Sequence, residues 1–213
     1  AEEFDMHWRL ARSGPRTRVA IMVSRHDHCL ADLLYRWQAG DLPIELPVVV
    51  SNHPDCAELC ARYGVPFLHL PVTPDTKAEQ EARVLELVRE HSIDFVVLAR
   101  YMQVLSADFC SRMPGRIINI HHSFLPGFKG ARPYQQAYER GVKMIGATAH
   151  YVTADLDEGP IIDQGVVPVD HSMDAAALSV MGRDVERQVL ARAVTLQAED
   201  RLFLIGHRVV VFH

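Results

Sequence analysis

RVAIMVS at residues 18–24 decides the fold class, because it is a short apolar run rich in β-branched side chains. Such a run is typical of a buried strand. DFVVLA at residues 94–99 is apolar after its first residue, which predicts a strand near the centre of a sheet, with both faces covered. Further strands are predicted at residues 44–51, 66–70 and 116–122.

Helical patterns alternate with these strands. They lie at residues 29–38, 54–63, 76–91 and 106–113. Strict alternation predicts βαβ units with right-handed crossovers and hence a parallel sheet. We therefore expect an α/β fold: a Rossmann-like, open, mostly parallel, twisted sheet with helices on both faces. Pro47 lies inside one predicted strand and indicates either an edge strand or a bulge.

The second half of the chain follows a different pattern. It contains a short helix, two strands, a long helix and a terminal hairpin, predicted at residues 134–140, 145–153, 160–169, 173–196 and 202–212. We expect the two strands to add to the sheet, either as antiparallel or as mixed additions. We expect one catalytic domain from residue 18 to residue 213.

Composition narrows the class of protein. The 213 residues carry a net charge of −5 and are 48% hydrophobic, which is typical of a globular domain and argues against nucleic acid as a partner. No apolar run is long enough for a membrane span. Cys56 and Cys60 are four residues apart, but no second pair completes a zinc site. We expect reduced thiols, no metal, no membrane contact and a cytoplasmic location.

The loop after the first predicted strand lacks the features of a nucleotide site. Dinucleotide-binding folds place G-x-G-x-x-G there, so that bare backbone can approach a pyrophosphate. Here residues 24–29 read SRHDHC and contain no glycine, and a Walker loop is absent as well. His26 and His28 in this loop are either exposed polar residues or part of a pocket.

The chemically informative stretch is NIHHSFLPGFKG, residues 119–130. Strand periodicity places Asn119 and His121 on one face, with Ile120 and His122 on the other. An asparagine amide can stabilise an oxyanion, and a histidine can share a proton near neutral pH. The adjacent histidines point apart and cannot both bind one ion easily. The alternative is a polar pair that only caps a turn.

A second polar cluster lies between the two strands of the second half. Asp155, Asp157 and Glu158 form either a solvated turn or a loop in which one carboxylate turns inward. An inward carboxylate would orient His121 or a water molecule. The sequence alone does not decide which one.

These two clusters resemble the folate-dependent formyltransferase family. The resemblance rests on residues 119–121, 123–126 and 128–130, and on DEGPII at residues 157–162. It implies a formyltransferase fold, catalytic roles for Asn119, His121 and Asp157, and no cofactor beyond the folate substrate. It also implies that the pterin lies against Arg100, Tyr101, Met102, Gln103, Val104, Leu105, Thr153, Ala154, Asp155 and Leu156. For Leu105, plain core packing is an equally good interpretation.

Further motifs resemble the hydrolytic branch of that family. They lie at residues 99–105, 117–126, 130–134, 146–151 and 182–186, and HCLADLL at residues 28–34 replaces the glycine-containing G-x-G-S-N loop of the transferring branch. The resemblance implies hydrolysis of 10-formyltetrahydrofolate to formate and tetrahydrofolate, which would supply formate for purine synthesis and balance one-carbon units. The alternatives are a phosphoribosylglycinamide formyltransferase and a non-catalytic folate-binding module.

The first 17 residues do not fit the α/β pattern. Phe4, Met6, Trp8 and Leu10 alternate as in a strand, which cannot bury its apolar face alone. The resemblance implies that residues 1–17 are the remnant of an upstream ACT-like domain and its linker, and that the protein is a homo-oligomer. The alternative is a short disordered tail.

Overall fold

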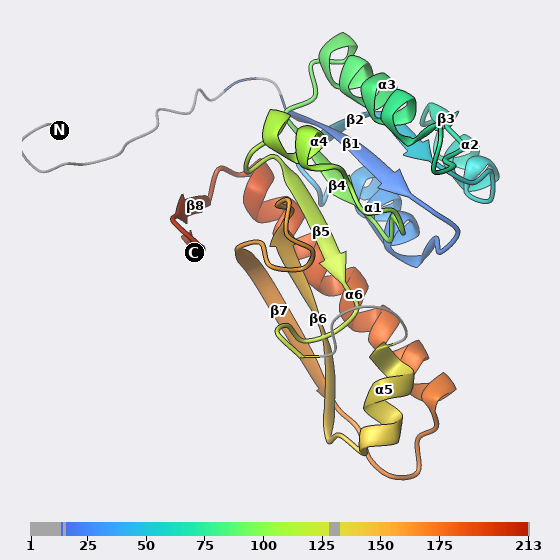
Figure 1. Cartoon of the computed structure of the whole chain (residues 1–213), viewed down its shortest axis with the longest axis vertical. Helices are drawn as coiled ribbons and strands as arrows, with labels where there is room; N and C mark the ends of the chain where they lie inside the picture. Colours follow the sequence, from blue (N-terminus) through green and yellow to red (C-terminus); the bar gives the residue numbers. More distant parts are fainter. Residues whose placement is uncertain (1–13, 15, 128–132, 213) are drawn as a thin grey trace, which may run out of the picture.

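The computed structural model describes residues 14, 16–127 and 133–212. Within them the chain forms a seven-stranded sheet in the order β3-β2-β1-β4-β5-β6-β7 and a separate hairpin of β8 and β9 (Figure 1). The strands are β1 (Thr17–Val23), β2 (Ile44–Ser51), β3 (Phe67–His69), β4 (Phe95–Leu98), β5 (Ile117–His121), β6 (Met144–Tyr151), β7 (Ile161–Pro168), β8 (Leu202–Ile205) and β9 (Arg208–Val211). The helices are α1 (His28–Ala39), α2 (Ala57–Arg62), α3 (Lys77–Glu90), α4 (Ala107–Arg112), α5 (Pro133–Arg140) and α6 (Ala175–Ala198).

The sheet confirms the predicted fold class. Strands β1 to β5 pair in parallel, and β6 and β7 add antiparallel strands at one side. β4 lies in the middle of the order, as its continuous apolar run predicts. The bulge is the correct interpretation of Pro47, because Arg18 pairs with Glu45 while Ala20 pairs with Val48, and β2 is an inner strand.

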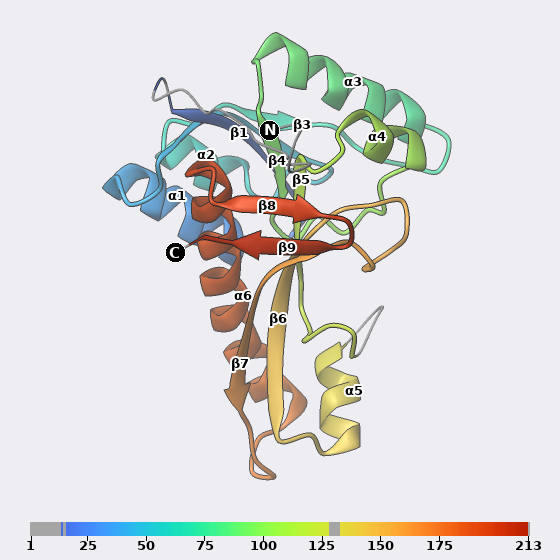
Figure 2. The same cartoon turned by 90° about the vertical axis from the view of Figure 1, so that its left-hand side faces the viewer.

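Helices cover both faces of the sheet (Figure 2). On β1, Val19, Ile21 and Val23 point into a core shared with α1, α2 and α6. Ala20 and Met22 point into the opposite core, shared with α3 and α4. Because both faces are buried, nearly every position of β1 and β4 is apolar, which is the pattern that identified these strands in the sequence.

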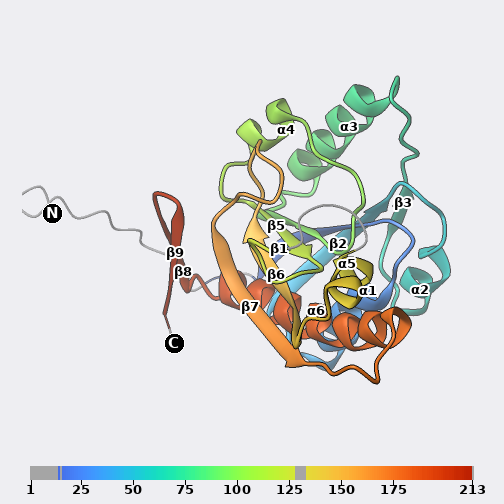
Figure 3. The ribbon, with the colours of Figure 1, turned by 60° about the horizontal axis from the view of Figure 1, so that its bottom comes forward.

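The antiparallel strands lengthen one end of the molecule. β6, β7 and α5 extend beyond the parallel half, and α6 runs along both (Figure 1). The β8–β9 hairpin lies to one side of the sheet and exposes Leu204 and Ile205 (Figure 3). Among the described residues, no helix has both the length and the apolar composition that crossing a membrane requires.

The predicted remnant at residues 1–17 lies outside the described residues, apart from Gly14, Arg16 and Thr17. Thr17 is the first residue of β1, one position before the predicted start of the catalytic domain. The upstream domain therefore stays a prediction.

Candidate active site

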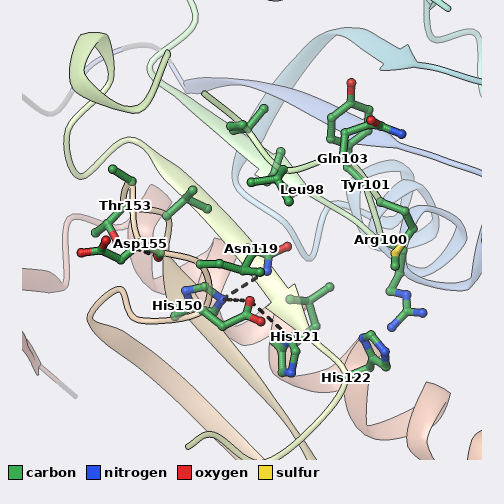
Figure 4. Close-up of a pocket in the computed structure, with 18 residues that line it drawn as sticks. Leu98, Arg100, Tyr101, Gln103, Asn119, His121, His122, His150, Thr153 and Asp155 are labelled. Atoms are coloured by element: carbon green, nitrogen blue, oxygen red, sulfur yellow. Dashed lines mark hydrogen bonds and ion pairs between the residues drawn. The ribbon is translucent and has the colours of Figure 1, made fainter. Parts of the chain in front are cut away.

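A cavity lies at the carboxyl ends of β4 and β5, where open α/β sheets bind their ligands. Residues 100–105 leave β4 along one wall, and residues 152–157 follow β6 along the other (Figure 4). Asn119 and His121 project from β5 between these two walls. The cavity brings together Asn119, His121 and Asp157 with the ten residues that the family resemblance places against the pterin. Its remaining lining residues are Leu98, Ile120, His122, His150 and Val152.

Asp157 is the carboxylate that turns inward. Its Oδ1 lies 3.4 Å from Nδ1 of His121, and both side chains are less than one-tenth exposed. Asp155 and Glu158 are exposed, so the three acidic residues differ sharply in environment. The hydrogen bond from His121 holds the pKa of Asp157 below its ordinary value against the effect of burial. Asp157 is therefore ionised at neutral pH and fixes the imidazole of His121.

His150 orients the amide of Asn119. Its Nδ1 lies 2.9 Å from the carbonyl oxygen of Tyr151, and because a carbonyl only accepts, Nδ1 carries the proton. Burial lowers the pKa of His150, so Nε2 is an unprotonated acceptor at neutral pH. That atom lies 3.1 Å from Nδ2 of Asn119, which donates to it. One amide hydrogen of Asn119 is thus fixed on His150 while the second is left for a ligand.

His121 has one ring nitrogen engaged and one available. Nδ1 faces Asp157, whereas Nε2 is buried and has no hydrogen-bond partner among the described residues. An unpaired buried nitrogen is costly unless a ligand uses it. Asn119 and His121 therefore offer two adjacent polar groups to whatever fills the cavity.

The wall after β4 is tied to the end of β1. The Met102 N–H donates to Oγ of Ser24 over 2.9 Å, and the Ser24 hydroxyl donates to Asn52. Arg100 has a left-handed φ of 64°, which is strained for a residue with a side chain. The Ser24 hydrogen bonds hold the turn that contains this strain. They place the exposed side chains of Met102 and Val104 at the mouth of the cavity.

Two residues of the same wall belong to the core. Tyr101 and Leu105 are buried among α3 and α4, and the Tyr101 hydroxyl accepts a hydrogen bond from Gln80. Leu105 thus packs in the core, as one of its two interpretations predicts, and it also lines the cavity. Whether the ten wall residues contact a pterin stays a prediction.

The predicted position of His122 was wrong. Alternation places His122 on the face opposite His121, but β5 ends at His121 and the chain bends there. The two rings consequently lie 5.2 Å apart and His122 lines the same cavity. His26 is exposed, as one of the two alternatives predicts. His28 is largely buried against Glu186 and does not line the cavity.

His150 is the functional residue that sequence reasoning missed. The GATAHY motif at residues 146–151 contains it, but its pattern indicated no role. Its position follows from register, because Asn119 and His150 are paired residues of the antiparallel strands β5 and β6. Paired residues on antiparallel strands lie side by side on one face, which brings the two side chains together.

Metal ligation finds little support in the donor chemistry. All four cysteines are buried and free, and burial raises the pKa of Cys56 to about 12. Among the described residues, one group has ligand atoms close together, namely His28, Cys29 and Glu186. Burial raises the pKa of Cys29 well above its ordinary value, and Glu186 already holds His28. The absence of a bound metal stays a prediction.

Comparison with known proteins shows what this chain is similar to. The model of the formyl transferase family matches residues 17–194. The chain is 56% identical to a formyltetrahydrofolate deformylase from Corynebacterium sp. (strain P-1) over 211 residues, which is 99% of this chain and 74% of the relative.

Solved structures of the same kind of protein are also similar to this chain. The crystal structure of a formyltetrahydrofolate deformylase from Pseudomonas syringae pv. tomato superposes with a TM-score of 0.95 at 48% identity, covering 100% of this chain and 71% of that one. A glycinamide ribonucleotide transformylase from Symbiobacterium toebii has the same fold with a TM-score of 0.88. It is 33% identical, with 97% of this chain and 99% of that one covered. The chain is thus more similar in sequence to the deformylases than to this transferring relative.

Proposed function

The chain belongs to the formyl transferase family, and we propose that it hydrolyses 10-formyltetrahydrofolate to formate and tetrahydrofolate. The observation that carries this proposal is its identity of about one half with deformylases over nearly the whole chain. The site agrees, since an amide, an imidazole and a carboxylate meet at the end of β5. The loop between β1 and α1 also lacks the glycines of a phosphate cradle.

The proposed chemistry is the attack of water on the formyl carbon. A carbon–oxygen bond forms, the bond from the formyl carbon to N10 breaks, N10 takes a proton, and formate leaves. The free amide hydrogen of Asn119 donates to the formyl oxygen as negative charge develops there. Removal of one such donor typically costs ~3–4 kcal/mol of transition-state stabilisation. His121 stabilises the same oxygen or protonates N10 through its unpaired Nε2.

Asp157 has two proposed tasks. It holds the His121 ring through Nδ1, and it is the charged carboxylate in the site that can accept a proton from the attacking water. His150 acts through Asn119, because it fixes the amide without taking both of its hydrogens. No cofactor is required, since the substrate brings the formyl group and water is the acceptor.

The proposed folate-binding region is the part of the cavity between residues 100–105 and 152–156. Leu98 and Val152 give it an apolar floor, and Met102 and Val104 expose apolar side chains at its mouth. Backbone groups of the two loops are available to recognise the polar edge of a pterin. This arrangement follows a common pattern, in which an apolar pocket carries a few placed polar groups.

The function is tested by incubating the protein with 10-formyltetrahydrofolate in the absence of any amine. Stoichiometric release of formate and tetrahydrofolate is the expected result. Turnover that requires glycinamide ribonucleotide would instead identify a transferase, and binding without turnover would identify a folate-binding module. Glycinamide ribonucleotide should neither bind saturably in calorimetry nor change the rate of formate release.

The proposal also covers the metabolic role, the location and the assembly of the protein. Hydrolysis of a formylated folate supplies formate for purine synthesis and returns free tetrahydrofolate, and we place this activity in the cytoplasm of a homo-oligomeric enzyme. Sedimentation of the purified protein tests the assembly, and a monomer at all concentrations would contradict it.

A further inference from the structure

A second polar cluster lies beside the proposed catalytic residues. Its centre is the carboxylate of Glu186 on α6, which is 1% exposed. His28 donates from Nε2 to Oε2 over 2.8 Å, and the Tyr134 hydroxyl donates to Oε1 over 2.5 Å. Nη1 of Arg100 lies 3.3 Å from Oε2. We call these four residues the Glu186 cluster.

The Glu186 cluster stabilises the ionised form of the Glu186 carboxylate. Burial alone would raise the pKa of Glu186, but the hydrogen bond from His28, the charge of Arg100 and the hydrogen bond from Tyr134 together hold it below its ordinary value. Three separate elements thus supply partners to one buried carboxylate: α1 through His28, the turn after β4 through Arg100, and α5 through Tyr134. Such convergence fixes the relative positions of these elements.

The cluster borders one end of the catalytic cavity through Arg100, the one member that lines it, while Tyr134 lines a neighbouring cavity together with His122. Arg100 lines the cavity, and its guanidinium points toward His122, away from Thr153 and Asp155 (Figure 4). The ring of His122 lies 5.2 Å from that of His121 and 6.1 Å from that of Tyr134. Burial and the nearby Arg100 lower the pKa of His122 to about 3, so this wall contains a neutral imidazole at physiological pH.

Gly182 makes room for the Tyr134 ring. A Cβ atom at this position of α6 would lie 2.1 Å from the Tyr134 hydroxyl oxygen. Any larger residue would therefore displace the ring from Glu186. The packing of α5 on α6 accordingly depends on a glycine in the middle of a helix, where glycine is otherwise unfavourable.

We propose that the Glu186 cluster closes the acceptor side of the site and thereby restricts the acceptor to water. This inference rests on the proposed function. The folate is proposed to lie between residues 100–105 and 152–156, so an acceptor must approach the formyl carbon from the other side of His121. The guanidinium of Arg100 and the ring of His122 lie on that side, and the ring of Tyr134 lies 6.1 Å from that of His122. Water fits beside these side chains, whereas an amine carries further atoms that need the space they fill.

The proposal predicts a different product when an amine can reach the formyl carbon. An amine that reaches the formyl carbon forms a carbon–nitrogen bond, the bond to N10 breaks, N10 gains a proton and the amine loses one. The products are tetrahydrofolate and an N-formyl amine in place of formate. Glycinamide is a suitable probe, because it is the amine portion of the glycinamide ribonucleotide after which the Symbiobacterium transformylase is named.

The test is Tyr134→Ala, with Tyr138→Ala as the matched control on the same helix, since Tyr138 is exposed. Both variants and the wild type are incubated with 10-formyltetrahydrofolate and excess glycinamide, and formate and N-formylglycinamide are quantified. The wild type and Tyr138→Ala should release formate. Tyr134→Ala should raise the ratio of N-formylglycinamide to formate at least about tenfold, in proportion to the glycinamide concentration.

Two results would overturn the inference. One is N-formylglycinamide production by the wild type at a rate comparable with hydrolysis, because the site would then be open. The other is an unchanged product ratio in Tyr134→Ala. If that variant does not fold, Tyr134→Val keeps apolar contact with α6 and is judged by the same ratio. Failure of the proposed function would be distinct, since it appears as absence of formate from the wild type without any amine.

Discussion

Asp157 provides the charge on which the site depends, and its backbone explains why it points inward. Its φ of 57° lies in the left-handed region, which aspartate tolerates better than most residues and which reverses the loop toward His121. Asp157→Asn keeps the shape but removes the charge. We expect kcat to fall by at least ~100-fold with the folate dissociation constant unchanged. Single-turnover kinetics and equilibrium binding separate the two effects.

The same loss is expected for Asn119→Ala and His121→Ala, because each removes a group that acts on the developing charge. Circular dichroism and thermal unfolding should show that both variants remain folded. Activity close to that of the wild type in either variant would remove that residue from the mechanism.

In the proposed mechanism His150 positions Asn119, so its loss should affect kcat more than KM. His150→Leu leaves the Asn119 amide without its acceptor, and one lost orienting hydrogen bond corresponds to about a tenfold fall in kcat. His150→Gln can still accept from Asn119 and should retain more activity than His150→Leu. Equal loss in both variants, or a change confined to KM, would refute the positioning role.

His122 makes the stability of the protein depend on pH. Its folded pKa of about 3 lies below the ordinary value of 6.5, so the unfolded chain binds the proton more readily. Its contribution is complete above pH 6.5 and is lost as the pH falls. Between pH 7 and about pH 5 the wild type should therefore lose ~2 kcal/mol of unfolding free energy more than His122→Gln. Urea unfolding at both pH values measures this difference.

The matched control is His171→Gln, since His171 is exposed. It should lose as much stability as the wild type over the same pH interval. The same loss in His122→Gln as in the wild type would show that His122 is protonated in the folded protein.

Some site residues could be predicted from the sequence and others could not, for identifiable reasons. Asn119 and His121 could be paired because strand alternation is a local rule. The choice of Asp157 needed the family resemblance, because three acidic residues in one loop look alike until the backbone is known. The prediction for His122 was wrong because β5 ends at His121, so the alternation of a strand does not extend to His122. His150 was missed because its role depends on pairing between two strands.

Among the elements, the loop between β6 and β7 depends on Gly159. A Cβ atom there would lie 1.7 Å from the carbonyl oxygen of Tyr151, so no side chain fits without backbone movement. Gly159→Ala should lower the free energy of unfolding by about 1–3 kcal/mol and, by displacing Asp157, reduce kcat roughly tenfold. Chemical denaturation and steady-state kinetics test both effects.

Gly141→Ala is the control for this substitution. Gly141 has a φ of 61° but open space around it, so the change should cost only about 1 kcal/mol of backbone strain and leave kcat unaltered. An equal effect of the two substitutions on kcat would show that the Gly159 loop does not position Asp157.

Elements with strong apolar patterns were the easiest to predict. β2 has the predicted bounds, and α3 differs from its prediction by one residue at each end. α2 begins three residues later than predicted, since residues 54–56 form a turn that composition does not distinguish from a helix start. The antiparallel pairing of β6 and β7 was one of two open alternatives, because strand order depends on contacts distant in sequence.

For the molecule as a whole, the proposed mechanism requires no metal. Its chemistry uses an amide, an imidazole and a carboxylate, and the cysteines are buried thiols. Activity should therefore survive exhaustive dialysis against EDTA. Loss of activity that zinc alone restores would contradict the mechanism and would direct attention to His28, Cys29 and Glu186.

The proposed function rests on the attack of water at the Asn119–His121–Asp157 site. Isotope labelling shows whether the oxygen atom of that water enters the formate. A single turnover of 10-formyltetrahydrofolate in H₂¹⁸O, without any amine, is followed by mass spectrometry of the formate. We predict formate that contains one oxygen from the solvent, formed by the wild type and at least ~100-fold more slowly by Asp157→Asn. Unlabelled formate, or labelled formate released equally fast by both proteins, would contradict this mechanism.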